Sequence, residues 1–184
     1  AGCGPVGLLT IRAALEKGAA MVVALDPVSS RREAAERWGA VGVEVDPADP
    51  AAAAQRVRDL TAGRGADAVV EAVGGEAAPR LAADLLRPGG RIAAVGVHTE
   101  PHLALSPGEL YDRNLTYSAG RCPARHHMPA ALALAVRDAN LLRTLITHRL
   151  QLGQAPDAYR RFAAREPGMH KVVFTLANGH PPGP

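Results

Sequence analysis

The chain has 184 residues, of which 47% are hydrophobic and only 3% aromatic, and its formal net charge is +3. This length suits one main domain with an aliphatic core, and the scattered basic residues lack the clustering typical of nucleic-acid binding. The two cysteines form no CxxC pair, and no apolar run approaches the length of a membrane-spanning helix. We therefore expect a cytoplasmic globular protein that binds neither nucleic acid nor membrane.

The first seven residues, AGCGPVG, contain a GxGxxG pattern formed by Gly2, Gly4 and Gly7. The pattern runs directly into a predicted helix over residues 5–18, where Pro5 occupies an allowed first-turn position. Glycines in this arrangement let a backbone approach a dinucleotide pyrophosphate at a helix N-terminus. The pattern therefore predicts a phosphate-binding loop.

A continuous apolar run over residues 19–26 predicts a strand buried on both faces, and it ends in Asp26. A carboxylate here can accept hydrogen bonds from the ribose hydroxyls of NAD, and its charge repels the 2′-phosphate of NADP. Arg31 and Arg32 could instead pair with that phosphate, or lie on a solvated helix face. Asp26 could also be only a turn residue before Pro27. The balance favours NAD over NADP.

Helices and strands alternate along the next part of the chain. Predicted helices cover residues 29–40, 51–63 and 76–86, predicted strands cover 41–46, 66–73 and 91–97, and a turn is predicted at 87–90. This alternation indicates right-handed βαβ units and a parallel sheet. We expect an α/β fold with a Rossmann-type doubly wound parallel sheet that lacks its first, central strand in this chain. A sequence that opens on the loop after that strand is expected to be a fragment, marginally stable and weak in cofactor affinity.

The pattern changes after residue 97. An irregular segment over 98–114 is followed by a predicted strand at 115–119 and a predicted helix at 128–139. The last part, from Leu145 onward, begins with LITHRLQL and continues with a predicted amphipathic helix at 155–167 and a predicted strand at 170–176.

Several motifs follow one another in a familiar order: GCGPVG, VVALDP, RREAAERWGA, GADAVVEAVGG, LLRPGGRIAAVGV, and the C-terminal THRL, AYRRF and KVVFTL. In this order they resemble the cofactor-binding half of the medium-chain, zinc-type alcohol dehydrogenases. The stretch RNLTYSAGRCPARHHMPAAL is most similar to the formaldehyde dehydrogenase and threonine dehydrogenase-like branch. The resemblance implies NAD-dependent hydride transfer to or from a small alcohol or aldehyde hydrate, with zinc bound only in an N-terminal domain absent from this sequence. It also implies that this chain alone is inactive.

The resemblance implies roles for individual residues as well. The pyrophosphate loop would consist of Gly2, Gly4, Pro5, Val6 and Gly7, and Lys171 would reach the same pyrophosphate. Asp26 and Arg31 would lie at the adenosine ribose. The nicotinamide end would be lined by Val73, Val95, Gly96 and Val97. For the three valines after the strands, simple core packing is an equal alternative. The implied domains are a cofactor-binding domain at 1–143, a closing segment at 144–176 and a tail at 177–184. The strand Leu115–Ala119 could pair two copies of the chain.

Other readings of the sequence remain open. The histidines and cysteines show no metal-ligand spacing, so no metal site and no catalytic residue is expected in this chain. Cys3 could have a lowered pKa beside the helix N-terminus, or be only a small loop residue. A methyltransferase that uses S-adenosylmethionine would also need a glycine loop and an acidic residue after its second strand. A non-catalytic nucleotide-binding remnant is a further alternative.

Overall fold

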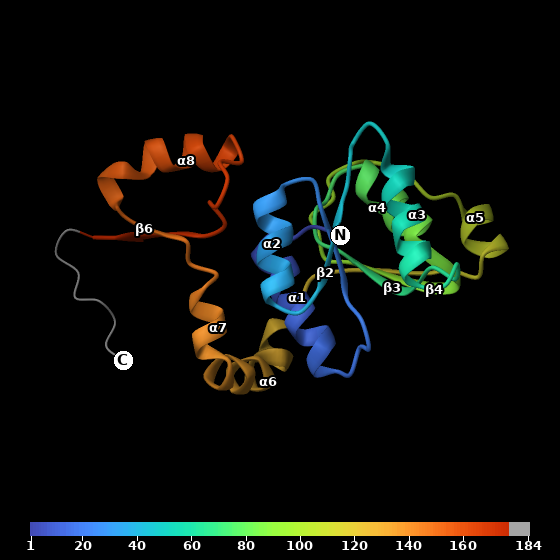
Figure 1. Cartoon of the computed structure of the whole chain (residues 1–184), viewed down its shortest axis with the longest axis horizontal. Helices are drawn as coiled ribbons and strands as arrows, with labels where there is room; N and C mark the ends of the chain where they lie inside the picture. The colour runs from blue at the N-terminus through green and yellow to red at the C-terminus, as the bar shows by residue number, and fades with distance from the viewer. Residues whose placement is uncertain (177–184) are drawn as a thin grey trace. The chain divides into compact units, whose positions relative to one another are not determined.

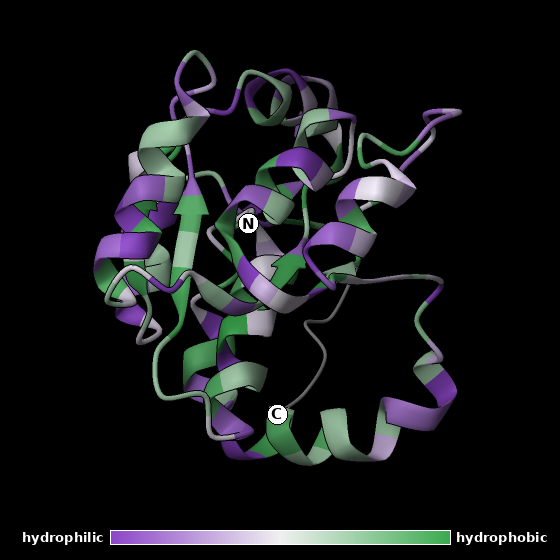
Figure 2. Cartoon of the chain, turned by 90° about the vertical axis from the view of Figure 1, so that its right-hand side faces the viewer, coloured by the Kyte–Doolittle hydropathy of each residue, from purple (hydrophilic) through white to green (hydrophobic). Residues whose placement is uncertain are grey.

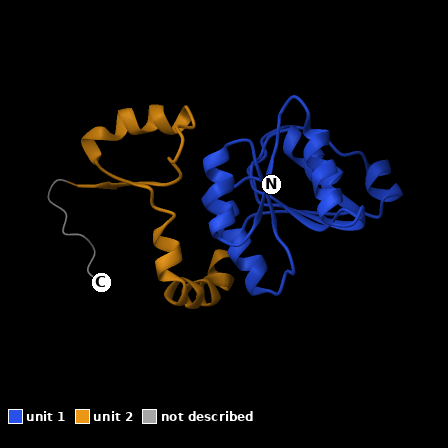
Figure 3. Cartoon of the chain, viewed as in Figure 1, with its two compact units in different colours: residues 1–122 blue, residues 123–184 orange. Residues whose placement is uncertain are grey.

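The structure, a computed structural model, describes residues 1–176. The chain forms two compact units, residues 1–122 and 123–184 (Figure 3). The division comes before α6 (Ala124–Arg137) and α7 (Ala139–Arg143), which the sequence analysis assigned to the first domain. Neither helix has a buried residue, so neither contributes to the core of the first unit. The predicted tail at 177–184 lies outside the described residues.

Helices and strands alternate through the first unit, as predicted (Figure 1). They are α1 (Pro5–Glu16), β1 (Val23–Asp26), α2 (Ser29–Arg37), β2 (Val41–Glu44), α3 (Pro50–Leu60), β3 (Ala66–Glu71), α4 (Ala77–Leu85), β4 (Leu86–Ala94), α5 (Pro107–Asp112) and β5 (Thr116–Ala119). Only α5 falls where an irregular segment was expected. Ser106 begins it with a capping box, since its hydroxyl accepts from the Glu109 amide and the Glu109 carboxylate accepts from the Ser106 amide.

All strand pairs of the first unit are parallel, which confirms the α/β class. β1 pairs with β2, and β3, β4 and β5 follow one another in a second sheet. The prediction that a turn at 87–90 precedes the strand is wrong, because β4 continues through these residues. These residues form an irregularity in the ladder, between the pairs Ala66 with Leu86 and Ala68 with Arg91.

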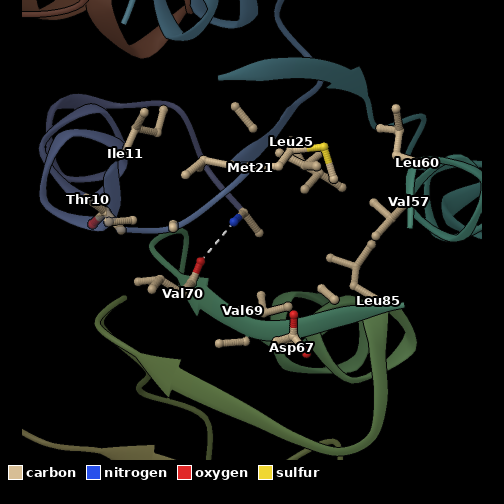
Figure 4. Close-up of a pocket in the computed structure, with 18 of the residues that line it drawn as sticks. Thr10, Ile11, Met21, Leu25, Val57, Leu60, Asp67, Val69, Val70 and Leu85 are labelled. Atoms are coloured by element: carbon tan, nitrogen blue, oxygen red, sulfur yellow. Dashed lines mark hydrogen bonds between the residues drawn. The ribbon is translucent and has the colours of Figure 1, made fainter. Parts of the chain in front are cut away.

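A cavity of about 760 Å³ lies between residues of β1 and β3 (Figure 4). Ile11 and Met21 line it from one side, and Val69 from the other. The first residues of the chain connect the two sheets across this region. The Ala1 nitrogen donates to the carbonyl oxygen of Val70, and the amide of Gly2 donates to that of Leu25, both at 2.8 Å. These bonds give each sheet edge one of the main-chain partners that an intervening strand would supply.

The core of the first unit is aliphatic and rich in alanine, as the composition implied. One cluster joins the strands to α3 and α4 and includes Leu25, Val43, Val57, Leu85 and Ile92. Residues outside this cluster are buried on α1 and α2, among them Leu8, Ile11, Ala34 and Ala35. The strands are accordingly hydrophobic, whereas the helices also carry hydrophilic residues (Figure 2). Ala24 and Leu25 are adjacent in β1 and both buried, as expected for a strand covered on its two faces.

The second unit continues after α7 with β6 (His148–Gln151), a short 3-10 helix (Leu152–Gln154), α8 (Ala155–Ala163) and β7 (Val172–Thr175). β6 and β7 pair in parallel, and β7 lies within the strand predicted at 170–176. In residues 1–176, no helix is both long and apolar enough to cross a membrane.

Candidate functional site

Two of the three glycines in the opening loop are required by the fold itself. Gly2 has a φ of +88°, and a Cβ there would lie 2.8 Å from Cγ2 of Val73. A Cβ on Gly7 would overlap the carbonyl oxygen of Gly2. Gly4 differs from both, because it has no positive φ and, apart from its two neighbours in the chain, no residue has a heavy atom within 4 Å of the place where its Cβ would stand. The space beside Gly4 is therefore open.

Gly4 is the N-cap of α1, and Pro5 occupies the first turn as predicted. No side chain among the described residues caps this helix. The N-terminal amides of a helix without a cap are available to an anion and carry the positive end of the helix dipole. Val6, in the same turn, is 54% exposed. The open space at Gly4 thus lies beside a helix end that favours a negative ligand.

Asp26 ends β1 and fastens the glycine loop to the strand. The residue is only 3% exposed, and its Oδ2 accepts from the amide of Cys3 at 2.9 Å. Its Oδ1 accepts from the amide of Val28 at 2.9 Å, which is the turn contact considered for this residue. Asp26 therefore positions the loop and forms a turn.

Both arginines that follow β1 contact the end of this strand. Nη1 of Arg31 lies 3.8 Å from Oδ2 of Asp26. Nη1 of Arg32 donates to the carbonyl oxygens of Asp26 and Pro27 at 2.8 and 2.9 Å, and its Nη2 lies 3.5 Å from Oε2 of Glu44. A purely solvated position is therefore wrong for Arg32.

The predicted nicotinamide-end residues lie just after β3 and β4. Val73, Val95 and Val97 are 62%, 49% and 81% exposed, so none of them packs into the core of the described chain. A Cβ on Gly96 would overlap the amide nitrogen of Gly74. The carboxyl ends of parallel strands meet at one edge of a sheet, so these loops form one surface.

Two residues at this edge were missed by the sequence analysis: Glu71 and His98. Glu71 ends β3 and is fully buried, with Oε1 accepting from the amides of Val73 and Gly74 at 2.6 and 2.7 Å. Nε2 of His98 lies 2.6 Å from Oε2 of Glu71. Burial raises the pKa of Glu71, but the hydrogen bonds from Gly74, Val73 and His98 outweigh it and hold the pKa below its ordinary value. The signal available in the sequence was an acidic residue inside the apolar run ADAVVEAV.

The remaining predicted residues give a mixed outcome. Burial, assisted by the charge of Asp26, raises the pKa of Cys3 to about 12, so the lowered pKa considered for this thiol is wrong. Lys171 lies in the second unit, where its carbonyl oxygen accepts from the amides of Thr147 and His148. Across residues 1–176, no group of three His, Cys, Asp or Glu side chains is placed to hold a metal ion.

Comparisons with known proteins give a consistent result. Residues 5–137 match the family described as zinc-binding dehydrogenase. Over 173 residues the chain is 39% identical to zinc-type alcohol dehydrogenase B of Aspergillus flavus, covering 94% of this chain and 40% of that protein. Over 177 residues it is 30% identical to an L-threonine 3-dehydrogenase of Symbiobacterium thermophilum, covering 94% and 49%.

The fold has matches among solved structures as well. Alcohol dehydrogenase TADH from Thermus sp. ATN1 superposes with a TM-score of 0.85 at 34% identity, covering 95% of this chain and 49% of that one. The chain thus spans about half, or somewhat less, of the length of the relatives it matches.

Proposed function

Because the chain belongs to the zinc-binding dehydrogenase family, we propose that it binds NAD as the cofactor part of an alcohol or aldehyde dehydrogenase. The family match confirms the resemblance seen in the motifs, and the structural match confirms the Rossmann-type fold. The methyltransferase alternative receives no support, since the matched family covers most of the chain, from the glycine loop to α6.

One observation carries the proposal: Gly4 is a glycine that the fold does not need. Gly2 and Gly7 are explained by backbone conformation and close packing, whereas the space beside Gly4 is open. That space adjoins the uncapped N-terminus of α1, where a pyrophosphate would meet amide groups and the helix dipole. A methyl group at Gly4 would occupy the position that the pyrophosphate needs.

The experiment follows from this difference between the glycines. We expect Gly4→Ala to reduce the affinity for NADH at least tenfold in a fluorescence titration, with the thermal unfolding midpoint close to that of the wild type. Gly153→Ala is the matched control, because a Cβ there also has no neighbour within 4 Å and the residue lies in the second unit. Unchanged NADH affinity in Gly4→Ala, or no binding by the wild type, would contradict the proposal.

The charge at the end of β1 supports NAD over NADP. The buried carboxylate of Asp26 disfavours a 2′-phosphate, and the guanidinium of Arg31 already faces this carboxylate. We propose that both residues lie at the adenosine ribose. Titrations with NADH, NADPH and S-adenosylmethionine test this choice, and tighter binding of NADPH than of NADH would reverse it.

The rest of the reaction is proposed for the whole protein rather than for this chain. The described residues do not fit a zinc site, so we propose that zinc and a small alcohol or aldehyde are bound mainly by residues outside this sequence. The edge strand β5, predicted at Leu115–Ala119 and formed by Thr116–Ala119, would join two copies in a cytoplasmic oligomer. The chain alone, given zinc, NAD and a panel of alcohols, should show no turnover. Turnover would exclude the alternative of a purely binding role.

A further inference from the structure

We propose that Glu71 and His98 form a positioning pair that holds the nicotinamide-end surface of the cofactor site in shape. This inference rests on the proposed function, since it assigns a role within the same site. Glu71 is fully buried, yet it lies at the end of β3, two residues before the exposed Val73. A buried carboxylate is retained at low cost only where hydrogen bonds satisfy both of its oxygens.

The hydrogen bonds of Glu71 connect two segments that are far apart in the sequence. Its Oε1 accepts from the amides of Val73 and Gly74, which follow β3. Its main-chain carbonyl accepts from the amides of Val95 and Gly96, at 2.8 and 3.0 Å, and these residues follow β4. One residue thus fixes the backbone of both loops.

His98 completes this arrangement from the second loop. An ionised carboxylate can only accept, so Nε2 of His98 must carry the hydrogen that it donates to Oε2 of Glu71 at 2.6 Å. The side chain of His98 is 22% exposed, which places it between the buried carboxylate and the surface. The histidine therefore ties the segment after Gly96 to the end of β3.

The glycines beside the pair show how closely the two loops approach. A Cβ on Gly96 would lie 2.8 Å from Oε2 of Glu71, and a Cβ on Gly74, whose φ is +85°, would overlap the carbonyl oxygen of Val97. The exposed Val73 lies on the loop after β3, and the exposed Val95 and Val97 lie on the loop after β4. The backbones of these two loops are in close contact, and the carboxylate of Glu71 joins them. A change in the pair should move these valines relative to one another.

The test separates the two ends of the dinucleotide. NADH contains the nicotinamide, whereas ADP-ribose keeps the adenosine, the pyrophosphate and the second ribose without it. We expect His98→Ala to weaken NADH binding at least tenfold and to change ADP-ribose binding less than twofold. His98→Gln, whose amide can still donate to Glu71, should recover NADH affinity to within about threefold of the wild type. His102→Ala is the matched control, because His102 is an exposed histidine of the same segment.

The binding results for NADH and ADP-ribose decide whether Glu71 and His98 have the positioning role. Equal losses for NADH and ADP-ribose in His98→Ala, no loss for either, or no recovery in His98→Gln would overturn the positioning role. If His98→Ala does not fold, Glu71→Gln decides by the same comparison, because it keeps one acceptor oxygen for the loop amides. A wild-type chain that binds ADP-ribose but not NADH would also overturn the inference. A wild-type chain that binds neither refutes the proposed function itself.

Discussion

Replacing Asp26 with alanine tests whether its carboxylate holds the glycine loop. The substitution leaves the amides of Cys3 and Val28 without their acceptor. Cys3 is 1% exposed, so its amide cannot readily turn to water, whereas the partly buried amide of Val28 can be rehydrated. Leaving the buried amide of Cys3 without its charged acceptor should destabilise the fold by about 1–3 kcal/mol, and losing the hydrogen bond from Val28 should add about 1 kcal/mol. The ion pair with Arg31, at 3.8 Å, adds less than about 1 kcal/mol.

We therefore expect Asp26→Ala to lower the free energy of unfolding by about 2–4 kcal/mol in a urea titration. Asp26→Asn keeps one acceptor oxygen but turns an amide group toward the other donor. Its free energy of unfolding should therefore lie between that of Asp26→Ala and that of the wild type. Asp59→Ala is the control: its exposed carboxylate accepts from Nε2 of Gln55 at 2.8 Å, and its loss should cost less than about 0.5 kcal/mol. If Asp26→Ala is as stable as Asp59→Ala, the carboxylate does not hold the loop.

Three further predictions concern the same unit. Gly7→Ala should lower the unfolding midpoint and abolish NADH binding, because the new methyl group would overlap the oxygen of Gly2; a variant with the wild-type midpoint would show that the loop can shift freely. Native protein at pH 8 should react with Ellman's reagent at the exposed Cys122 alone, since burial raises the pKa of Cys3 to about 12. In guanidinium, both thiols should react. Rapid reaction of two thiols in the native protein would contradict the burial of Cys3. The pKa of Glu71 is lowered in the folded state from 4.5, so its contribution is present at neutral pH and is lost as the pH falls through the lowered value. Glu71→Gln should therefore flatten the acid limb of the stability curve, and an unchanged limb would show that the ionised carboxylate does not stabilise the fold.

Local sequence patterns were sufficient for much of the first unit. The glycine spacing, the apolar run before Asp26 and the alternation of helices with strands each depend on neighbouring residues, so their positions could be predicted. The capping box at Ser106 was equally local, and it could have identified α5.

Contacts between distant residues could not be predicted in the same way. His98 and Glu71 are 27 positions apart, and nothing in the composition of either segment indicates that they meet. The division between the units at Cys122 depends on whether α6 and α7 find a core to bury against, which their helical pattern does not reveal. The raised pKa of Cys3 likewise follows from burial beside Asp26 rather than from its place near a helix end.

The separation of the two sheets has a consequence for cooperativity. The β1–β2 ladder and the β3–β4–β5 ladder are distinct, and the main-chain bonds of Ala1 and Gly2 connect their edges. Segments without a continuous ladder can open separately, so amide hydrogen exchange should reveal two protection classes in the free chain. Under the proposed function, a dinucleotide held at Gly4 and at Val73 would contact the loop that Gly2 bonds to β1 and the loop that follows β3. Its binding should merge the two classes into one, which would make the ligand a structural link within the fold.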